Sequence, residues 1–336
     1  MTRFNRIALL MLSVLAISER AYSQATAFPT KPVTIIMAVA AGGPTDVEIR
    51  LYTKAMTELT GQPFLMDYKV GAGGVIGTAY VAKAAPDGYT LLQMSGNFSV
   101  MPSVVRDLPF NTLKDFAFVS LMSERAQVLV VTPSFPAKSF PEYLAYAKAN
   151  PGKVSLGTTG QGGINHMMSS WLHSLGNAKV TYVPYKGEAP LVPDLISGRL
   201  DAAAIGVATA YRLAKAGKVR ALGSSLSARS KMWPDLLTIS EQGLSQFVHT
   251  SWVGISAPAA TPLPVINRLS ENFAKAAKMP DVTAPLEPEG WVLVGSSPAR
   301  LRQLVVEETE RWARLAKEQG IVPEQWLSER VQDQEN

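Results

Sequence analysis

Short apolar runs rich in β-branched residues alternate with longer segments of helical periodicity along most of this 336-residue chain. Such alternation is typical of consecutive βαβ units, in which a helix connects one strand to the next. It predicts an α/β fold with a largely parallel sheet. The predicted strands are residues 33–39, 64–69, 90–95, 116–122, 128–132, 154–159, 180–185, 200–206, 219–225 and 251–257.

Several helix ends are marked by particular residues. Ser139 and Glu142 have the Ser-x-x-Glu spacing of a capping box, which predicts a helix start there. Pro264 likewise predicts the start of the helix in "PVINRLSENFAKAAK". The last long helix is predicted from about residue 297 to 318, and Gly320 ends it.

The first residues have the organisation of a secretory signal peptide. A basic start, "MTRFNR", precedes the apolar run "IALLMLSVLAI", and "AYS" at 21–23 has the small-x-small form of a cleavage site. The main alternative is a membrane anchor, but a spanning helix needs about 20 apolar residues, and this run ends at Glu19 and Arg20. We therefore predict a signal peptide over residues 1–23 and a periplasmic location for the mature protein.

Composition excludes several classes of protein. The chain contains no cysteine, which excludes disulfides, thiol catalysis, thiolate metal sites and a lipid anchor on an N-terminal cysteine. Removal of residues 1–23 takes away three arginines and one glutamate and lowers the formal net charge from +5 to +3. The remaining charges are scattered, so nucleic-acid binding is not supported. The length favours two domains.

Sequence motifs for nucleotide and hydrolytic chemistry are missing. "GAGGVIG" resembles the dinucleotide-binding fingerprint, but the third glycine of that pattern would fall on Ile76. The sequence contains no phosphate-binding loop, no G-x-S-x-G elbow and no H-E-x-x-H pattern. His166 and His173 are seven residues apart, which does not suit a metal-binding pair on one helix, so their default role is at the surface or in capping. We predict no cofactor, no metal site and no catalytic residue.

Three glycine-rich turns follow predicted strands. The carboxyl ends of parallel strands gather along one edge of a sheet, and ligands bind there. Glycine lets the backbone approach a ligand closely, and the helix that follows supplies unpaired N–H groups and the positive end of its dipole. We therefore predict that these turns bind a small negative group, although any one of them could be a tight connection without a ligand. The turns are residues 40–46, 71–74 and 158–163.

Further polar and aromatic residues follow strands at the same predicted edge. Ser95, Asn97 and Tyr185 lie at strand ends and could line a pocket, although a core or lid role is an equal alternative for Tyr185. His166 follows the third turn; a capping or surface role is the default for it, and contact with a ligand is the alternative. For Asp46, stabilisation of the first turn of its own helix is favoured over direct ligand contact.

Several stretches, taken together and in order, resemble the Bug family, the extracytoplasmic solute receptors of tripartite tricarboxylate transporters. They extend over roughly residues 28–321 and are "FPTKPVTIIMAVAAGGPTD", "VGAGGVIGTAYVAKAAPDGYTLL", "GTTGQGGINH", "VPYKGEAPLVPDLISGRLDA" and "AGKVRALGSSLSARS". The resemblance implies a periplasmic binding protein-like fold of type II, with two α/β domains, a hinge and an interdomain ligand cleft. It also implies a small organic carboxylate as the ligand and the membrane permease subunits of such a transporter as the partner.

The resemblance further implies which residues contact the ligand. In the family, backbone and hydroxyl donors of the first loop and of a glycine-rich loop in the second domain hold the carboxylate, helped by bound water. Those positions fall on residues 39–45 and 158–166. This chain has Ala38-Val39-Ala40-Ala41 where many members have Pro-Phe-Pro-Pro, which makes the pocket floor smaller. With the strand-end residues above, the predicted ligand-binding set is Val39, Ala41, Gly42, Gly43, Thr45, Asp46, Ser95, Asn97, Thr158, Thr159, Gly160, Gly162, Ile164, His166 and Tyr185.

Chain order places the predicted domain boundaries. Domain 1 comprises residues 26–124 and 246–322, domain 2 comprises residues 125–245, and residues 323–336 form a polar C-terminal tail. We expect a monomer that binds no nucleic acid.

The ligand and the role of the protein stay open at this point. The ligand could be a dicarboxylate, a tricarboxylate or an aromatic acid. A sensory receptor with a signalling partner is an alternative to transport, and a secreted enzyme using His166, Asp46 or Lys186 is a weaker one because a recognisable nucleophile and base are missing.

Overall fold

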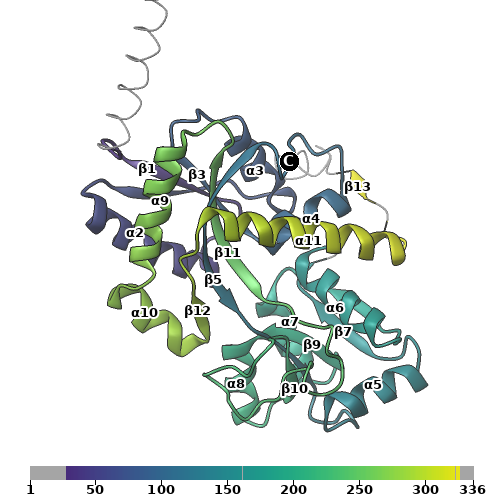
Figure 1. Ribbon diagram of the computed structural model, residues 1–336. Coiled ribbons are helices and arrows are strands. Elements are labelled where there is room, and N and C mark those ends of the chain that lie inside the picture. Colours follow the sequence, from purple (N-terminus) through teal and green to yellow (C-terminus); the bar gives the residue numbers. More distant parts are fainter. Residues whose placement is uncertain (1–27, 161, 322, 326–336) are drawn as a thin grey trace, which may run out of the picture.

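The computed structural model describes residues 28–160, 162–321 and 323–325, which form two α/β domains (Figure 1). The predicted signal peptide, residues 1–23, lies outside the described residues, as does the C-terminal tail beyond residue 325. Within the described part of the chain, no helix has both the length and the apolar character needed to cross a membrane.

The first domain contains a six-stranded sheet in the order β12-β5-β11-β3-β1-β2. Its strands are β1 (Val33–Met37), β2 (Phe64–Tyr68), β3 (Thr90–Ser95), β5 (Phe116–Arg125), β11 (Ser251–Pro258) and β12 (Trp291–Leu293). Its helices are α2 (Pro44–Thr60), α3 (Val75–Ala82), α4 (Gly96–Val104), α9 (Leu263–Ala276), α10 (Pro280–Leu286) and α11 (Pro298–Glu318), with short 3-10 turns η1 (Ala72–Gly74) and η2 (Glu287–Glu289). A separate pair joins β4 (Val105–Arg106) and β13 (Glu324–Gln325).

The second domain contains a five-stranded sheet in the order β10-β6-β9-β7-β8. Its strands are β6 (Gln127–Val131), β7 (Ser155–Thr158), β8 (Thr181–Pro184), β9 (Ala202–Gly206) and β10 (Arg220–Ser224). Its helices are α5 (Phe140–Ala149), α6 (Ile164–Leu175), α7 (Glu188–Ile196) and α8 (Val207–Lys215).

Both sheets are mixed, so the prediction of a largely parallel sheet was wrong. In the first sheet β1 pairs in parallel with β2 and β3, but β11 is antiparallel to both β3 and β5. In the second sheet β7 pairs in parallel with β8 and β9, but β6 is antiparallel to β9 and β10. The physical reason is the path of the chain between the domains. β6 comes directly after β5 of the first domain, and β11 comes after the loop that leads back from the second domain. Neither strand is therefore preceded by a helix that connects it to a strand of its own sheet.

The carboxyl ends of the parallel strands in the two sheets face each other. β5 runs toward the second domain and continues as β6 after Ala126 alone. β1, β2 and β3 run in the direction of β5, because β11 is antiparallel to both β3 and β5. In the second sheet Gly206, at the end of β9, pairs with Gln127, at the start of β6, so β7, β8 and β9 end on the side of the first domain. The loops after these two groups of strands are therefore opposed.

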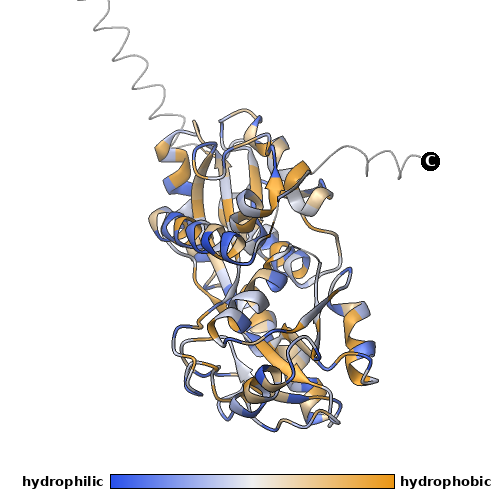
Figure 2. Ribbon diagram, turned by 90° about the vertical axis from the view of Figure 1, so that its right-hand side faces the viewer, coloured by the Kyte–Doolittle hydropathy of each residue, from blue (hydrophilic) through white to orange (hydrophobic). Residues whose placement is uncertain are grey.

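Adjacent residues of the central strands point to opposite faces and enter separate cores. Ile35 packs with α2, α9 and α10, whereas Ile36 packs with α3, α4 and α11. In the second domain Leu129 packs with α5 and α6, whereas Val128 packs with α7 and α8. Burial on both faces explains why these strands are continuous apolar runs in the sequence, and Figure 2 shows the hydrophobic residues concentrated on the strands. Each fully buried aliphatic side chain contributes about 1.5–3 kcal/mol.

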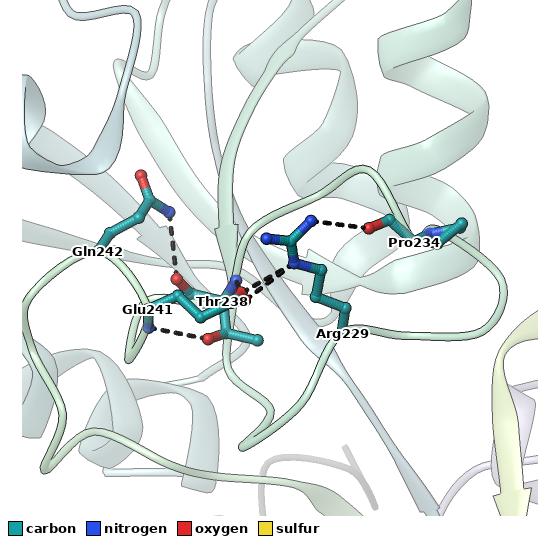
Figure 3. A network of polar contacts seen from close by, with 5 residues as sticks. All are labelled: Arg229, Pro234, Thr238, Glu241 and Gln242. Carbon is teal, nitrogen blue, oxygen red and sulfur yellow. Dashed lines mark hydrogen bonds and ion pairs between the residues drawn. The ribbon is translucent and has the colours of Figure 1, made fainter.

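The return crossing, residues 225–250, is an ordered loop. The Arg229 Nε lies 2.9 Å from the Glu241 Oε1, and the Glu241 Oε2 accepts a 2.7 Å hydrogen bond from the Thr238 amide (Figure 3). Ser225 joins the two crossings, because its hydroxyl accepts a hydrogen bond from the Gln127 amide and donates one to the His249 carbonyl. The two connections between the domains are thus held together.

Two histidines lie in the interior, not at the surface. His173 is 2% exposed and its ring nitrogens contact the Tyr143 hydroxyl at 2.8 Å and the Ser169 carbonyl at 2.7 Å. His249 is also 2% exposed, with its Nδ1 3.7 Å from the Glu308 Oε1. Burial lowers the pKa of both imidazoles, so both rings are neutral at neutral pH, and it raises the pKa of the Glu308 carboxyl to about 7, so this group is only partly ionised there. The default surface role for His173 was wrong.

All ten predicted strands are present, with ends shifted by at most a few residues. Ser139 is the N-cap of α5 and Ser297 is the N-cap of α11, which begins at Pro298. The helix predicted to start at Pro264 begins one residue earlier, at Leu263.

Candidate ligand-binding site

The loop between β1 and α2 presents backbone at the edge where the domains face each other. Gly42 has φ 84°, a left-handed conformation that favours glycine, and Gly43 is the N-cap of α2. Pro44 occupies the first helical position, as predicted from its missing N–H. Ala41 and Gly42 are exposed and Thr45 is half-buried. The first-turn amides of α2 have no intrahelical acceptor, so the loop can donate hydrogen bonds to an anion.

Asp46 shapes this loop from within. Its side chain is 3% exposed, and its Oδ2 accepts hydrogen bonds from the Gly42 amide at 3.0 Å and the Arg50 Nε at 3.1 Å. Its Oδ1 accepts a hydrogen bond from the Tyr68 hydroxyl. Burial alone would raise the pKa of Asp46, but the hydrogen bonds from Tyr68, Gly42 and Arg50 together lower it. The carboxylate therefore stays ionised and orders the glycine turn, as in the alternative favoured for it from the sequence.

A cavity of about 280 Å³ lies between the two domains. Gly42, Gly43 and Pro44 line it from the start of α2, and Ala208 and Thr209 line it from the start of α8. The two helix N-termini come from different domains, so an anion in the cavity is favoured by both dipoles. Of the predicted residues, Gly42 and Gly43 border this space.

A second, smaller cavity of about 20 Å³ lies within the first domain, at the ends of β1 and β3. It is large enough for about one water molecule. Val39, Ser95 and Asn97, all predicted from the sequence, line it together with residues of the second glycine turn.

The third glycine turn, between β7 and α6, is closed by its own contacts. Gly160 and Gly162 have φ values of 106° and 69°, so the turn needs both glycines. Thr158 is 2% exposed and Thr159 is half-buried. The His166 Nδ1 accepts a 3.0 Å hydrogen bond from the Gly162 amide, so this imidazole caps its own loop. Burial lowers the pKa of His166, which keeps the ring neutral and able to accept that bond.

The start of α6 contacts the first domain directly. The Ile164 amide donates a 2.9 Å hydrogen bond to the Asn97 Oδ1, which brings two predicted residues together across the domains. Tyr185 takes no part in this contact. Its hydroxyl instead donates a 2.7 Å hydrogen bond to the Asp194 Oδ2 on α7, within the second domain. The involvement of these loops in ligand binding stays a prediction.

Residues that the sequence interpretation did not select also border the large cavity. Arg125 ends β5, and Trp291 begins β12 with its ring centroid 4.6 Å from the Arg125 Cζ. Thr209 lies in the first turn of α8. One signal could have revealed Arg125, because it is a charged residue between two apolar strands at the predicted domain boundary between residues 124 and 125. In the described residues, no cluster of three or more acidic or histidine side chains could hold a metal ion.

The family to which this chain belongs is established by a family model that matches most of its residues. The family model for the tripartite tricarboxylate transporter family receptor matches residues 49–321. The chain belongs to this receptor family. Among the relatives of this receptor, BugT of Bordetella pertussis (strain Tohama I) is 32% identical over 302 residues, which cover 88% of this chain and 91% of BugT.

Solved structures agree with this membership. Rpa4515 of R. palustris, solved with adipate, has a TM-score of 0.78 and 30% identity, covering 88% of this receptor and 100% of Rpa4515. MatC of Rhodopseudomonas palustris, solved with bound malate, has a TM-score of 0.75 and 31% identity, covering 86% of this receptor and 100% of MatC. The predicted Bug-type family and the periplasmic binding protein-like fold are both confirmed.

Proposed function

We propose that this receptor captures a small organic carboxylate in the cavity between its domains. The observation that carries the proposal is the convergence of two helix N-termini, from α2 and α8, on one cavity of about 280 Å³. Relatives solved with adipate and with malate support an organic acid as the ligand. A dicarboxylate, a tricarboxylate and an aromatic acid are the candidate classes.

The proposed mechanism is ligand-dependent closure of the two domains. A carboxylate that contacts both helix starts gains interactions that are available only when the domains are close together, and it therefore shifts the population toward the closed form. No covalent bond is made or broken. The closed receptor then delivers the acid from the periplasm to the permease subunits of a tripartite tricarboxylate transporter, or, as the alternative, presents itself to a signalling partner.

A thermal-shift screen of organic acids tests this proposal. A bound acid stabilises the folded protein by RT ln(1 + [L]/Kd), or about 2.7 kcal/mol at a concentration 100 times Kd. The control for each acid is its neutral amide, which keeps the shape and lacks the charge. We expect saturable stabilisation by at least one acid and none by its amide. Stabilisation by neutral sugars or cations alone would contradict the proposal, and mass spectrometry of the incubated acid would reveal any turnover.

A further inference from the structure

We propose that Arg125 forms a cationic subsite of the interdomain cavity that holds a second acidic group of the ligand, and hence that the protein prefers acids with two carboxylates. This inference rests on the proposed function and makes it more specific. The predicted anion-binding turns, residues 40–46, 71–74 and 158–163, contain no lysine or arginine. Arg125 adds a formal positive charge at a different place in the same cavity.

The Arg125 side chain lacks a partner for part of its guanidinium. Its Nε is buried and has no hydrogen-bond acceptor among the described residues. Loss of hydration lowers the pKa of this guanidinium, although an arginine remains charged at neutral pH. A buried donor without an acceptor is unfavourable, and more so when it is charged. A ligand carboxylate in the cavity would remove that cost, because guanidinium and carboxylate can form two parallel hydrogen bonds.

The surrounding structure holds this guanidinium in place. The Trp291 ring, which is 7% exposed, stacks 4.6 Å from the Arg125 Cζ. Gly206, at the start of α8, has no side chain, and a Cβ atom there would lie 3.6 Å from the Arg125 Cζ. Arg125 is thus packed between one aromatic residue of the first domain and bare backbone of the second. Such fixed placement reduces the entropy lost when a ligand binds.

The nearby carboxyl groups leave the Arg125 charge available. Glu188 is the strongest nearby negative influence, but its Oε2 accepts a 3.1 Å hydrogen bond from the Gly206 amide. Glu289 forms a 2.7 Å ion pair with Arg212 at the cavity wall. Glu48 is fully buried, and burial raises its pKa to about 8, so it is mainly protonated at neutral pH. None of the three is within ion-pair distance of the Arg125 guanidinium in the described structure.

The dimensions and polarity of the cavity suit a short acid with two anionic ends. Its volume of about 280 Å³ is just below the range of about 300–1,000 Å³ for small-molecule sites, which suits a short ligand. One end of the acid would lie against the first turn of α2 beside Gly43, because the Gly42 amide already donates to Asp46. The other end would lie against Arg125. Monocarboxylates of the same length can satisfy only one of these positions.

The test compares pairs of linear acids of equal chain length, with one or two carboxylates, by isothermal titration calorimetry. Wild-type protein should bind the dicarboxylate of at least one pair about 10- to 100-fold more tightly than its monocarboxylate, the ratio expected for one hydrogen-bonded charge. Arg125→Gln should abolish that ratio and weaken the dicarboxylate by a similar factor. The control is Arg229→Gln, which removes an equal charge that is paired with Glu241 and does not line the cavity; it should change the ratio less than threefold.

The outcomes separate this inference from the proposed function. If no acid binds wild-type protein, including benzoate and citrate, the proposed function is wrong and the inference falls with it. If acids bind but equal-length pairs have the same affinity in wild-type protein, only the inference is overturned. This last comparison needs no variant, so it decides the question even if Arg125→Gln does not fold.

Discussion

Glu48 lies on the buried face of α2, and its side chain is 0% exposed. Neither oxygen has a hydrogen-bond partner among the described residues. Burial raises its pKa to about 8, and Ser123 and Arg125 only moderate this effect. Because the folded-state pKa lies above the unfolded value of about 4.5, the folded protein binds more protons than the unfolded chain between these two pH values. Rising pH therefore destabilises the fold across that window.

The first prediction concerns this carboxyl group. Replacing Glu48 with glutamine removes the ionisation, so the loss of stability between pH 5 and pH 9 should be smaller in Glu48→Gln than in wild-type protein. The difference has a ceiling of about 5 kcal/mol from the shift in pKa. Urea unfolding at pH 5, 6, 7, 8 and 9 measures it.

The exposed Glu58 on the same helix provides the matched control. Glu58→Gln should retain the pH profile of wild-type protein. Parallel profiles for wild-type protein and Glu48→Gln would contradict the raised pKa.

For single residues, the sequence predicts which of them lie near the candidate site better than it predicts what each of them does there. The glycines at 42 and 43 and the proline at 44 could be predicted to form an exposed helix start, because backbone geometry dictates those residue types. Asp46 was correctly favoured as a stabiliser of its own turn. Arg125 was not selected, because its importance depends on Trp291 and α8, which are distant in sequence.

At the scale of single elements, α5 shows how a local signal becomes structure. The Ser139 hydroxyl accepts a 3.4 Å hydrogen bond from the Glu142 amide, as a capping box requires. The Glu142 carboxylate instead bonds the Lys138 amide at 2.8 Å, one residue before the expected Ser139 amide. The N-terminal cap is therefore satisfied from both directions, with a shift of one residue.

The second prediction tests that cap. Ser139→Ala removes the acceptor for the Glu142 amide and should lower the free energy of unfolding by about 1 kcal/mol. Ser139→Gly should cost only a few tenths of a kcal/mol, because glycine is tolerated at N-caps. Urea denaturation of both variants checks the difference. Equal stability of wild-type protein and Ser139→Ala would show that the side-chain bond contributes nothing.

Elements with strong internal patterns could be predicted, and elements that depend on partners could not. The central strands β1, β6 and β9 are continuous apolar runs because they are buried on both faces, whereas the edge strands β2 and β8 are largely half-buried or exposed. β12 has three residues and exists because it pairs with β5. α10 contains Pro285 and only seven residues, so its sequence carries little helical signal. The direction of β6 and β11 depends on the path between domains, which periodicity does not encode.

At the scale of the whole molecule, the two domains pack through α4, α6 and α11. Ile164 and Met167 of α6 pack with Val100 of α4 and Trp312 of α11 in one apolar cluster. Gly96 at the start of α4 is required there, because a Cβ atom at this position would lie 2.7 Å from the Ile164 Cγ1. The contact between domains therefore depends on close approach of the two helix starts.

The third prediction uses this close approach. Gly96→Ala should overpack the contact and lower the free energy of unfolding by about 1–3 kcal/mol. Ile164→Ala removes the clashing atoms, so the double variant should be more stable than the sum of the two single changes predicts. A double-mutant cycle by urea unfolding measures this coupling. A coupling energy of zero would show that the domains are separated at this point in solution.

One consequence of the chain path concerns the order of events during capture. Arg125 is the last residue of β5, and only Ala126 separates it from β6. A rotation about this joint displaces the Arg125 guanidinium far less than it displaces Arg212 and Glu289, which face each other from different domains. An acid that contacts Arg125 when it first binds would therefore keep this contact while the two domains close. We expect ligands to enter with a charged end leading, and we expect salt to slow their association more than it speeds their release.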